Sequence, residues 1–175
     1  MKNIFETEHL IIRSFVPYDA KKLYQNHLEE ALARWIPNER YQDIEEAENA
    51  IAFYSDCVQK RTLPYVLAIV LKETNELIGD TGINMVEGKE AEAEIGFSIC
   101  ESVSGRGYAT EALRAMTEYA MTELGIKSLS GRVLNGNSAS VRVLEKSGYT
   151  FIEEEFGAED DPYGKGMMIF MKTCE

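Results

Sequence analysis

The amino-acid sequence predicts an α/β (α+β) fold in which helices flank a mixed, mostly antiparallel twisted sheet of about seven strands. Short apolar runs of strand length occur between segments whose apolar residues recur at the helical period of 3.6. Three of these strands follow one another with only turns between them, which is typical of antiparallel neighbours. With 175 residues, 45% of them hydrophobic, the chain can form a full core, and we expect a single domain over residues 1–175.

The first third of the chain predicts one strand and two helical segments. Leu10–Phe15 has the character of a short strand that ends near Pro17. Asp19 is placed to cap a helix, and helical character continues to Trp35. Asp43 begins the capping box Asp43-Ile44-Glu45-Glu46. The apolar residues that follow it share one helix face, namely Ile44, Ala47, Ile51, Tyr54 and Val58.

The middle third predicts a meander of three strands. Tyr65–Leu71 is a nearly continuous apolar run of strand length. Residues 73–76 have the composition of a turn, so Leu77–Met85 returns as the antiparallel neighbour. A loop at residues 87–89 then leads into a strand at Ala93–Cys100.

The last third predicts a helix, a strand, a second helix and two strands. The first helix follows Gly107, carries its apolar residues on one face and ends near Gly125. Asn137 can cap the second helix and Gly148 can end it. The remaining segments are a strand at Ser128–Leu134, the helix at Ser138–Ser147, strands at Tyr149–Phe156 and Met167–Met171, and a surface loop at Gly157–Gly166.

The composition excludes several classes of function. Thirty acidic and 18 basic residues give a net charge of −12, whereas a protein that binds nucleic acid needs a basic face. No apolar run approaches the roughly 18 residues of a membrane span, and the first residues lack the apolar stretch of a signal peptide. We therefore expect a cytoplasmic protein with no nucleic-acid or membrane partner. The acidity fits a cationic substrate, and it fits solubility alone equally well.

The cysteines and histidines predict no metal centre. Cys57, Cys100 and Cys174 are odd in number and lack the spacing of a metal site. His9 and His27 are isolated, with no cysteine or acidic arrangement beside them that indicates a ligand set. We therefore expect unreactive thiols and no metal cofactor.

The most informative stretch is Ser104–Ala112, in which two glycines join a predicted strand to a strongly patterned helix. A helix start offers unpaired N–H groups and a partial positive charge, which suit a phosphate. Gly105 and Gly107 allow an anion to approach the backbone closely. The stretch lacks the Lys-Ser/Thr ending of a P-loop, so it does not match a P-loop nucleotidase. It also lacks one glycine of the dinucleotide fingerprint, which disfavours a dinucleotide-binding oxidoreductase. A plain tight turn would use the same two glycines.

At these residues the chain resembles the GCN5-related N-acetyltransferase (GNAT) superfamily, and within it the RimJ/RimL-like branch that acetylates ribosomal-protein N-termini. The resemblance extends from Thr7 to about Lys172. It implies a GNAT fold with a sheet splayed at its central strands, and acetyl-coenzyme A (acetyl-CoA) as cosubstrate. The motifs that carry it are Glu8-His9-Leu10-Ile11-Ile12-Arg13, Glu76-Leu77-Ile78-Gly79, Glu94-Ile95-Gly96-Phe97, residues 105–112 and residues 137–149.

The resemblance assigns the coenzyme to the glycine loop and to an open strand. The family's phosphate loop falls on Ser104–Ala109, where Ser104 departs from the usual Gln or Arg. The pyrophosphate would bind backbone amides of Gly105, Arg106, Gly107, Tyr108, Ala109 and Thr110. The pantetheine arm would pair with the backbone of a neighbouring strand, at Phe97, Ser98 and Ile99.

The resemblance also implies an acid catalyst. In this branch a serine three residues after the Asn protonates the leaving thiolate, which assigns that role to Ser140 and places Asn137 against the arm of the coenzyme. Many relatives use a tyrosine at the position that Leu144 holds here. A simpler alternative exists for both residues, because Asn137 could serve only as a helix cap and Ser140 could bond only its own backbone.

Glu94 is the candidate general base, because some relatives keep a catalytic glutamate on this strand. Glu92 points to the same side by the strand period of two, and either residue could be a solvated surface glutamate. An α-amine, with a pKa near about 8, is already partly neutral and could react through a water chain alone.

Trp35 and Tyr41 are the candidate acceptor-binding residues by family position, although aromatic side chains more often serve packing. The resemblance thus predicts an acetyl-CoA-dependent N-acetyltransferase that acts on a primary amine, preferably a protein N-terminus of the ribosomal-protein-alanine type. The alternatives are a small cationic amine, such as a polyamine or aminoglycoside, and a non-catalytic acyl-CoA-binding module. We expect a monomer or a homodimer.

Overall fold

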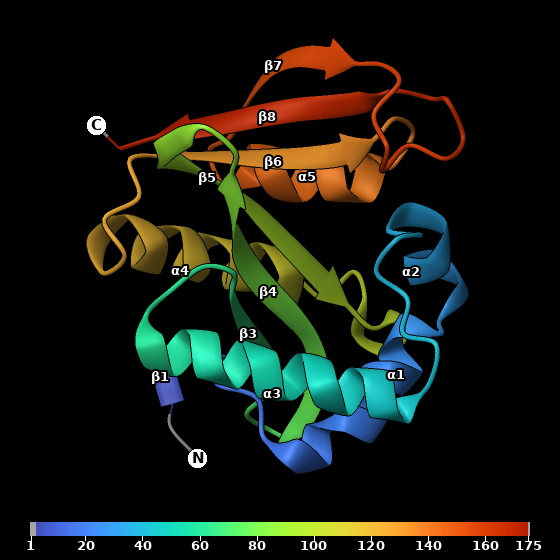
Figure 1. Ribbon diagram of the computed structural model, residues 1–175, viewed down its shortest axis with the longest axis vertical. Helices are drawn as coiled ribbons and strands as arrows, with labels where there is room; N and C mark the ends of the chain where they lie inside the picture. The colour runs from blue at the N-terminus through green and yellow to red at the C-terminus, as the bar shows by residue number, and fades with distance from the viewer. Residues whose placement is uncertain (1–2, 175) are drawn as a thin grey trace.

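The computed structural model describes residues 3–174 and contains one eight-stranded sheet (Figure 1). The strand order is β1-β2-β3-β4-β5-β6-β8-β7, and every neighbouring pair is antiparallel except β5 and β6. The predicted mixed, mostly antiparallel sheet is therefore confirmed, with one strand more than the seven expected. The strands are β1 (Asn3–Glu6), β2 (Leu10–Arg13), β3 (Tyr65–Leu71), β4 (Glu76–Val86), β5 (Lys89–Ile99), β6 (Ser128–Leu134), β7 (Thr150–Glu155) and β8 (Met167–Thr173).

The helices lie on both faces of this sheet. Helices α1 and α3 pack on one face of β3 and β4, while α4 covers the opposite face of β4 and β5 with α5 beside it (Figure 1). In the described part of the chain, no helix has the length and apolar character needed to cross a membrane. The helices are α1 (Ala20–His27), α2 (Glu30–Trp35), α3 (Ile44–Lys60), α4 (Tyr108–Thr122) and α5 (Ser138–Lys146), with short 3-10 turns η1 (Pro17–Asp19) and η2 (Glu101–Val103).

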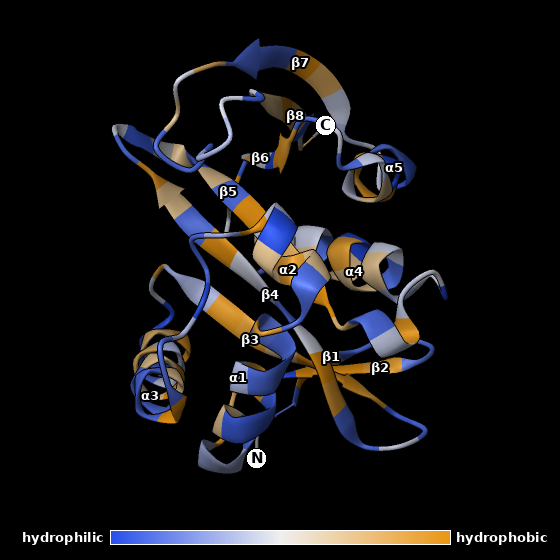
Figure 2. Cartoon of the chain, turned by 90° about the vertical axis from the view of Figure 1, so that its right-hand side faces the viewer, coloured by the Kyte–Doolittle hydropathy of each residue, from blue (hydrophilic) through white to orange (hydrophobic). Residues whose placement is uncertain are grey.

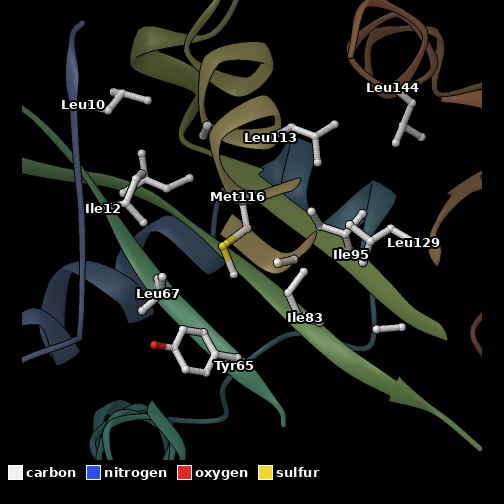
Figure 3. Close-up of a cluster of buried hydrophobic side chains, with 14 of the residues drawn as sticks. Leu10, Ile12, Tyr65, Leu67, Ile83, Ile95, Leu113, Met116, Leu129 and Leu144 are labelled. Atoms are coloured by element: carbon white, nitrogen blue, oxygen red, sulfur yellow. The ribbon is translucent and has the colours of Figure 1, made fainter. Parts of the chain in front are cut away.

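The main core lies between α4 and the centre of the sheet. Leu113 and Met116 point from α4 toward Ile83 on β4 and Ile95 on β5, and these side chains are almost entirely buried (Figure 3). The colouring in Figure 2 shows orange hydrophobic strands between helices whose outer faces are blue. Burial of these apolar side chains is the main stabilising contribution to the sheet centre.

The predicted helical segment from Asp19 to Trp35 is wrong in one respect, because it is broken into α1 and α2. Glu29 adopts an extended backbone between the two helices, with a ψ of 141°. Its carboxylate accepts a hydrogen bond from the Glu101 N–H at 2.7 Å, and the Glu101 carboxylate accepts one from the Ala31 N–H at 2.9 Å. These two hydrogen bonds connect the break between α1 and α2 to η2. Asp19 does not cap α1 with its side chain, because its carboxylate binds Arg13 at 2.6 Å and 2.9 Å.

The predicted N-caps of α3 and α5 are confirmed, but the reciprocal half of the capping box is not formed, because the Glu46 carboxylate accepts from the Gln42 N–H instead of the Asp43 N–H. The Asp43 carboxylate accepts a hydrogen bond from the Glu46 N–H at 2.8 Å, at the start of α3. The Asn137 side chain caps α5. Gly107 precedes α4 with a φ of +91°, a conformation that side-chain-bearing residues rarely adopt.

The two central strands pair over only a short stretch. β5 and β6 are in register at Glu92–Glu94 with Ser128–Ser130, and beyond these three pairs the strands separate. β4 continues beside β5 as far as the pair Gly79 and Ile99. β8 continues beside β6 as far as the pair Met167 and Leu134. The splayed centre implied by the family resemblance is therefore present, and it opens toward the carboxyl end of β5.

Candidate active site

A cavity of about 400 Å³ occupies the place where β5 and β6 separate. Its walls come from β4, β5, β6, the start of α5 and the segment that joins α2 to α3, residues 36–43, which we call the acceptor loop. The cavity brings together six of the residues that the sequence predicts for the site, from three separate segments of the chain. They are Trp35, Tyr41, Glu94, Phe97, Asn137 and Ser140.

The floor of the cavity is a polar stripe on β4 and β5. Cross-strand partners in an antiparallel pair share one face, and here they are Asp80 with Ser98 and Asn84 with Glu94. Between these pairs two glycines oppose each other, Gly82 and Gly96. A Cβ atom added at Gly96 would meet nothing within 4 Å, so the absence of a side chain leaves open space above the backbone. The strand backbone at Gly82 and Gly96 is therefore not covered by side chains of these two residues, and a polar pair lies on each side of it.

One edge of β5 is left open by the separation. The Cys100 N–H donates to the Ile78 carbonyl at 2.8 Å, which directs Cys100 toward β4. Backbone groups alternate between the two edges of a strand, so Ser98 also faces β4, while Phe97 and Ile99 face the gap. The Ser98 hydroxyl donates to Asp80 at 2.7 Å. Of the three predicted pantetheine-binding positions, Phe97 and Ile99 thus present their amides at the open edge.

The glycine loop lies where the gap between the strands widens, after β5 and η2. Gly105 and Gly107 both have positive φ, at +78° and +91°. Among the described residues, none of the amides from Gly105 to Thr110 donates to a protein acceptor; the first helical bond runs from the Glu111 N–H to the Gly107 carbonyl. Such a series of free N–H groups at the start of a 15-residue helix fits an anionic phosphate. These residues do not line the cavity itself.

Asn137 and Ser140 stand at the first turn of α5, on the β6 side of the cavity. The Asn137 Oδ1 atom accepts a hydrogen bond from the Ser140 N–H at 3.2 Å, so the predicted helix cap is real. The Ser140 hydroxyl has no hydrogen-bond partner among the residues that the structure describes. Leu144 is almost completely buried and contacts the place where Gly131 would carry a Cβ, so this position belongs to the core and also lines the cavity with an apolar side chain.

Glu94 reaches the cavity from β5, opposite Arg132 on β6. The two side chains approach to 3.9 Å, while Arg132 makes closer ion pairs with Asp160 and Glu155 at 2.9 Å and 2.8 Å. Burial raises the pKa of Glu94; the Arg132 guanidinium opposes that shift, and the Asp160 and Glu155 carboxylates reinforce it. A carboxyl whose pKa is raised toward neutrality is suited to accept a proton.

Trp35, directly before the acceptor loop, and Tyr41, within it, both line the cavity. The Trp35 ring lies 3.9 Å from the position of a Cβ on Gly136, so it spans from α2 to the turn before α5. The Tyr41 ring packs edge-on against His27, with ring centroids 5.1 Å apart. Burial raises the pKa of Tyr41 well above its usual range, so its hydroxyl remains protonated.

Residues 9–150 match the acetyltransferase (GNAT) domain family. The chain belongs to the GNAT acetyltransferase family. The match covers most of the chain, and it includes β5, the glycine loop and the start of α5. Together with N-acetyltransferase relatives it establishes an acetyl-CoA-dependent N-acetyltransferase, as the resemblance predicts.

Relatives and solved structures agree with this assignment. The uncharacterised N-acetyltransferase YoaA of Bacillus subtilis is 30% identical over 147 residues, which are 83% of this chain and 82% of that protein. The ribosomal-protein-S5-alanine acetyltransferase of Vibrio fischeri aligns with a TM-score of 0.84 and 18% identity, covering 97% of this chain and 95% of that chain. The spermidine N-acetyltransferase of Vibrio cholerae, solved with CoA and spermine, aligns with a TM-score of 0.80 and 15% identity, covering 95% and 96%. At these identities the solved structures show the shared GNAT fold.

Several polar residues of this GNAT cavity were not predicted from the sequence, among them His27, Glu39 and Asp80. The His27 ring bonds to Asp80, which is 53 residues further along the chain. Glu39 lies in the acceptor loop, and its carboxylate has no partner among the described residues. No local spacing connects these positions, so only the folded chain reveals them. Within residues 3–174, no group of three or more His, Cys, Asp or Glu side chains is arranged to hold a metal ion.

Proposed function

We propose that the chain, acting as a single domain, acetylates a primary amine bound in this cavity, preferably the N-terminal amine of a protein. The observation that carries the proposal is that Glu94 on β5 and Ser140 on α5, the helix that follows β6, line one cavity. Phe97, at the open edge of β5, lines the same cavity. A proton acceptor, a proton donor and a free backbone N–H are the groups that amine acetylation needs.

The coenzyme side of the site is the glycine loop and the open edge of β5. The free amides of Gly105–Thr110 fit a pyrophosphate. The amides of Phe97 and Ile99 fit the amide groups of a pantetheine arm, which is itself an extended chain. Asn137 uses its side-chain oxygen for the helix cap, so its NH₂ group is the part that can donate to that arm.

Each proposed catalytic residue has a defined task. Acetyl-CoA supplies the activated acetyl group. Glu94 accepts the proton that the amine loses, directly or through water. The Phe97 N–H stabilises negative charge on the carbonyl oxygen, and the Ser140 hydroxyl gives a proton to the thiolate. Trp35 and Tyr41 hold the acceptor beside these groups, and this placement reduces the entropy cost of reaction.

Two acceptor classes are supported by different observations. A protein N-terminus is supported by the RimJ/RimL-like motifs and by the fold shared with a ribosomal-protein-alanine acetyltransferase. A small cationic amine is supported by the carboxylates of Glu39, Asp80 and Asp160, which line the cavity. The fold shared with a spermidine acetyltransferase also fits this second class.

Thiol release from acetyl-CoA tests the proposal across a mixed panel of acceptors. The panel contains alanyl and seryl peptides, spermidine, an aminoglycoside and free amino acids. Release with the peptides supports the N-terminal acceptor. Release with spermidine or the aminoglycoside alone overturns that acceptor and keeps the transfer chemistry. Binding of acetyl-CoA with no release in any reaction would instead favour a module that only binds the coenzyme.

A further inference from the structure

His27 connects the acceptor loop to the floor of the cavity. Its ring is 3% exposed at the end of α1. The Nε2 atom lies 2.9 Å from the Asp80 carboxylate on β4, and the Nδ1 atom lies 2.6 Å from the Glu39 carbonyl in the acceptor loop. One side chain therefore bridges the sheet and the middle of the loop.

The contacts of His27 fix its protonation state. A carbonyl oxygen only accepts, and so does an ionised carboxylate, so both ring nitrogens must carry a proton. The Asp80 carboxylate also accepts a hydrogen bond from the Ser98 hydroxyl at 2.7 Å. Burial of the ring lowers the pKa of His27, but the charge and hydrogen bond of Asp80 outweigh burial and raise that pKa to about 9. The ring is thus an imidazolium at neutral pH.

The contact with His27 is the backbone hydrogen bond that links the acceptor loop to a distant part of the chain. Ile36, Pro37, Asn38, Glu39, Arg40 and Tyr41 all line the cavity. The other backbone hydrogen bonds of these residues are local, such as the one from the Glu39 N–H to the Ile36 carbonyl at 3.0 Å. The bond to His27 instead reaches α1 and, through Asp80, the sheet. The Tyr41 ring packs against the same imidazolium.

We propose that His27 is a positioning residue, whose imidazolium is held by Asp80 and fixes the acceptor loop as one wall of the acceptor cavity. A neutral imidazole at this position could donate to only one of the two acceptors, which would free either the loop or the sheet contact. This proposal rests on the proposed function, because it gives the wall a role in holding the amine acceptor. Glu39 and Tyr41 would then be presented to the acceptor by His27.

Hydrogen exchange in the full chain saturated with acetyl-CoA tests the proposal without an identified acceptor. The variants are His27→Gln and Asp80→Asn, and the control is Tyr149→Phe, which removes the buried hydrogen bond between the Tyr149 and Thr117 hydroxyls at 2.7 Å. We expect amides of residues 38–42 to exchange at least about tenfold faster in both test variants, with α4 unchanged. The control should leave residues 38–42 unchanged. Equal acceleration throughout the protein, or none in the loop, would overturn the proposal.

Two further measurements keep the test decisive. Trp35 is the single tryptophan of the chain and adjoins the loop, so its quenching by acrylamide should increase in His27→Gln and not in the control. Imidazole ¹⁵N spectra of the unmodified protein at pH 7.5 should show both His27 nitrogens protonated, and a neutral ring would overturn the proposal even if the variants fail to fold.

Kinetics then separate this proposal from the proposed function. With whichever acceptor of the panel reacts, His27→Gln should raise the acceptor KM about tenfold and leave the Kd of acetyl-CoA within about twofold. An unchanged acceptor KM would overturn the positioning role while the transfer activity stands. If no acceptor reacts, the proposed function fails, and the exchange measurement still decides whether His27 fixes the loop.

Discussion

The Asn137 side chain accepts a hydrogen bond from the Ser140 backbone N–H at 3.2 Å, so these two residues share the first turn of α5. The cap uses the Ser140 backbone and leaves its hydroxyl without a partner among the described residues. A helix cap and a proton donor are therefore compatible at this turn. The sequence presented them as alternatives, whereas the geometry allows both at once.

Ser140→Ala should lower kcat by about a hundredfold, because a positioned general acid typically contributes that much or more. The Kd of acetyl-CoA should stay within about twofold, since the variant keeps the backbone cap. Steady-state kinetics and calorimetry measure the two effects. Ser138→Ala is the matched control, because Ser138 is exposed on the same turn and should leave kcat unchanged. A normal kcat in Ser140→Ala would show that another group protonates the thiolate.

Gly107→Ala should weaken acetyl-CoA binding by at least about tenfold, because a φ of +91° is unfavourable for alanine and the loop must shift. Gly125→Ala is the control at the other end of the same helix. Gly125 also has a positive φ, at +72°, and a Cβ there would also meet nothing within 4 Å. Both variants should lose similar stability in urea unfolding. If both also lost affinity equally, the glycine loop would not be the phosphate site.

Glu94→Gln should reduce kcat/KM, and the reduction should become smaller as the pH falls. Burial raises the pKa of Glu94, so when the pH is lowered the unmodified residue takes up a proton earlier than an ordinary glutamate and loses the basic function that the variant lacks. A pH profile of kcat/KM measures the effect. Glu92→Gln is the control, because Glu92 is on the same strand and forms an ion pair with Lys89 at 2.8 Å. A reduction that does not vary with pH would exclude proton removal by Glu94.

The His27 imidazolium should make stability depend on pH in a defined window. The pKa is about 9 in the folded chain against 6.5 in the unfolded chain, so the folded state binds the proton more tightly. The stabilisation is fully present below about pH 6.5 and is lost as the pH rises through about 9. Its size is on the order of 3 kcal/mol, from about 1.4 kcal/mol per pKa unit.

Urea unfolding at pH 7 and pH 9.5 measures this loss. The charged groups that act on the His27 ring are the Asp80 and Glu39 carboxylates, and the Glu39 carbonyl and the Tyr41 ring contact it. Burial raises the pKa of the Glu39 carboxyl to about 7, so the His27→Gln comparison is what separates the two groups. His27→Gln should lose less stability between the two pH values than the unmodified chain. Equal losses in the two proteins would show that other groups produce the pH dependence.

Much of the fold follows from local signals in the sequence. The apolar period predicts α4, and the Asp43 and Asn137 caps predict the starts of α3 and α5, because each signal acts within a few residues. The meander follows from short turns between apolar runs. The glycine loop and Ser140 also lie in contiguous motifs, and the family resemblance identifies them directly.

The remaining features depend on contacts between distant segments. The break after α1 is stabilised by hydrogen bonds that Glu101 forms with Glu29 and Ala31, and Glu101 lies 72 and 70 residues further along the chain than these two residues. β1 has only four residues and pairs only with β2, so its pattern is too short for a prediction. The bond between His27 and Asp80 joins α1 to β4 and has no local signature. Each of these features exists only once the chain has folded.

The separation of β5 from β6 gives this sheet an exposed strand edge in its interior. Unpaired strand edges normally lie at the outside of a sheet, where they invite pairing with another protein and aggregation. Here the Phe97 edge is enclosed by β6, α5 and the acceptor loop, which leave a cavity of only about 400 Å³. The free edge is therefore short and faces a narrow gap, which suits a single extended molecule better than a second sheet. The fold thus keeps unpaired backbone groups of β5 available to a ligand, at a place where they are less accessible for pairing with another copy of the chain.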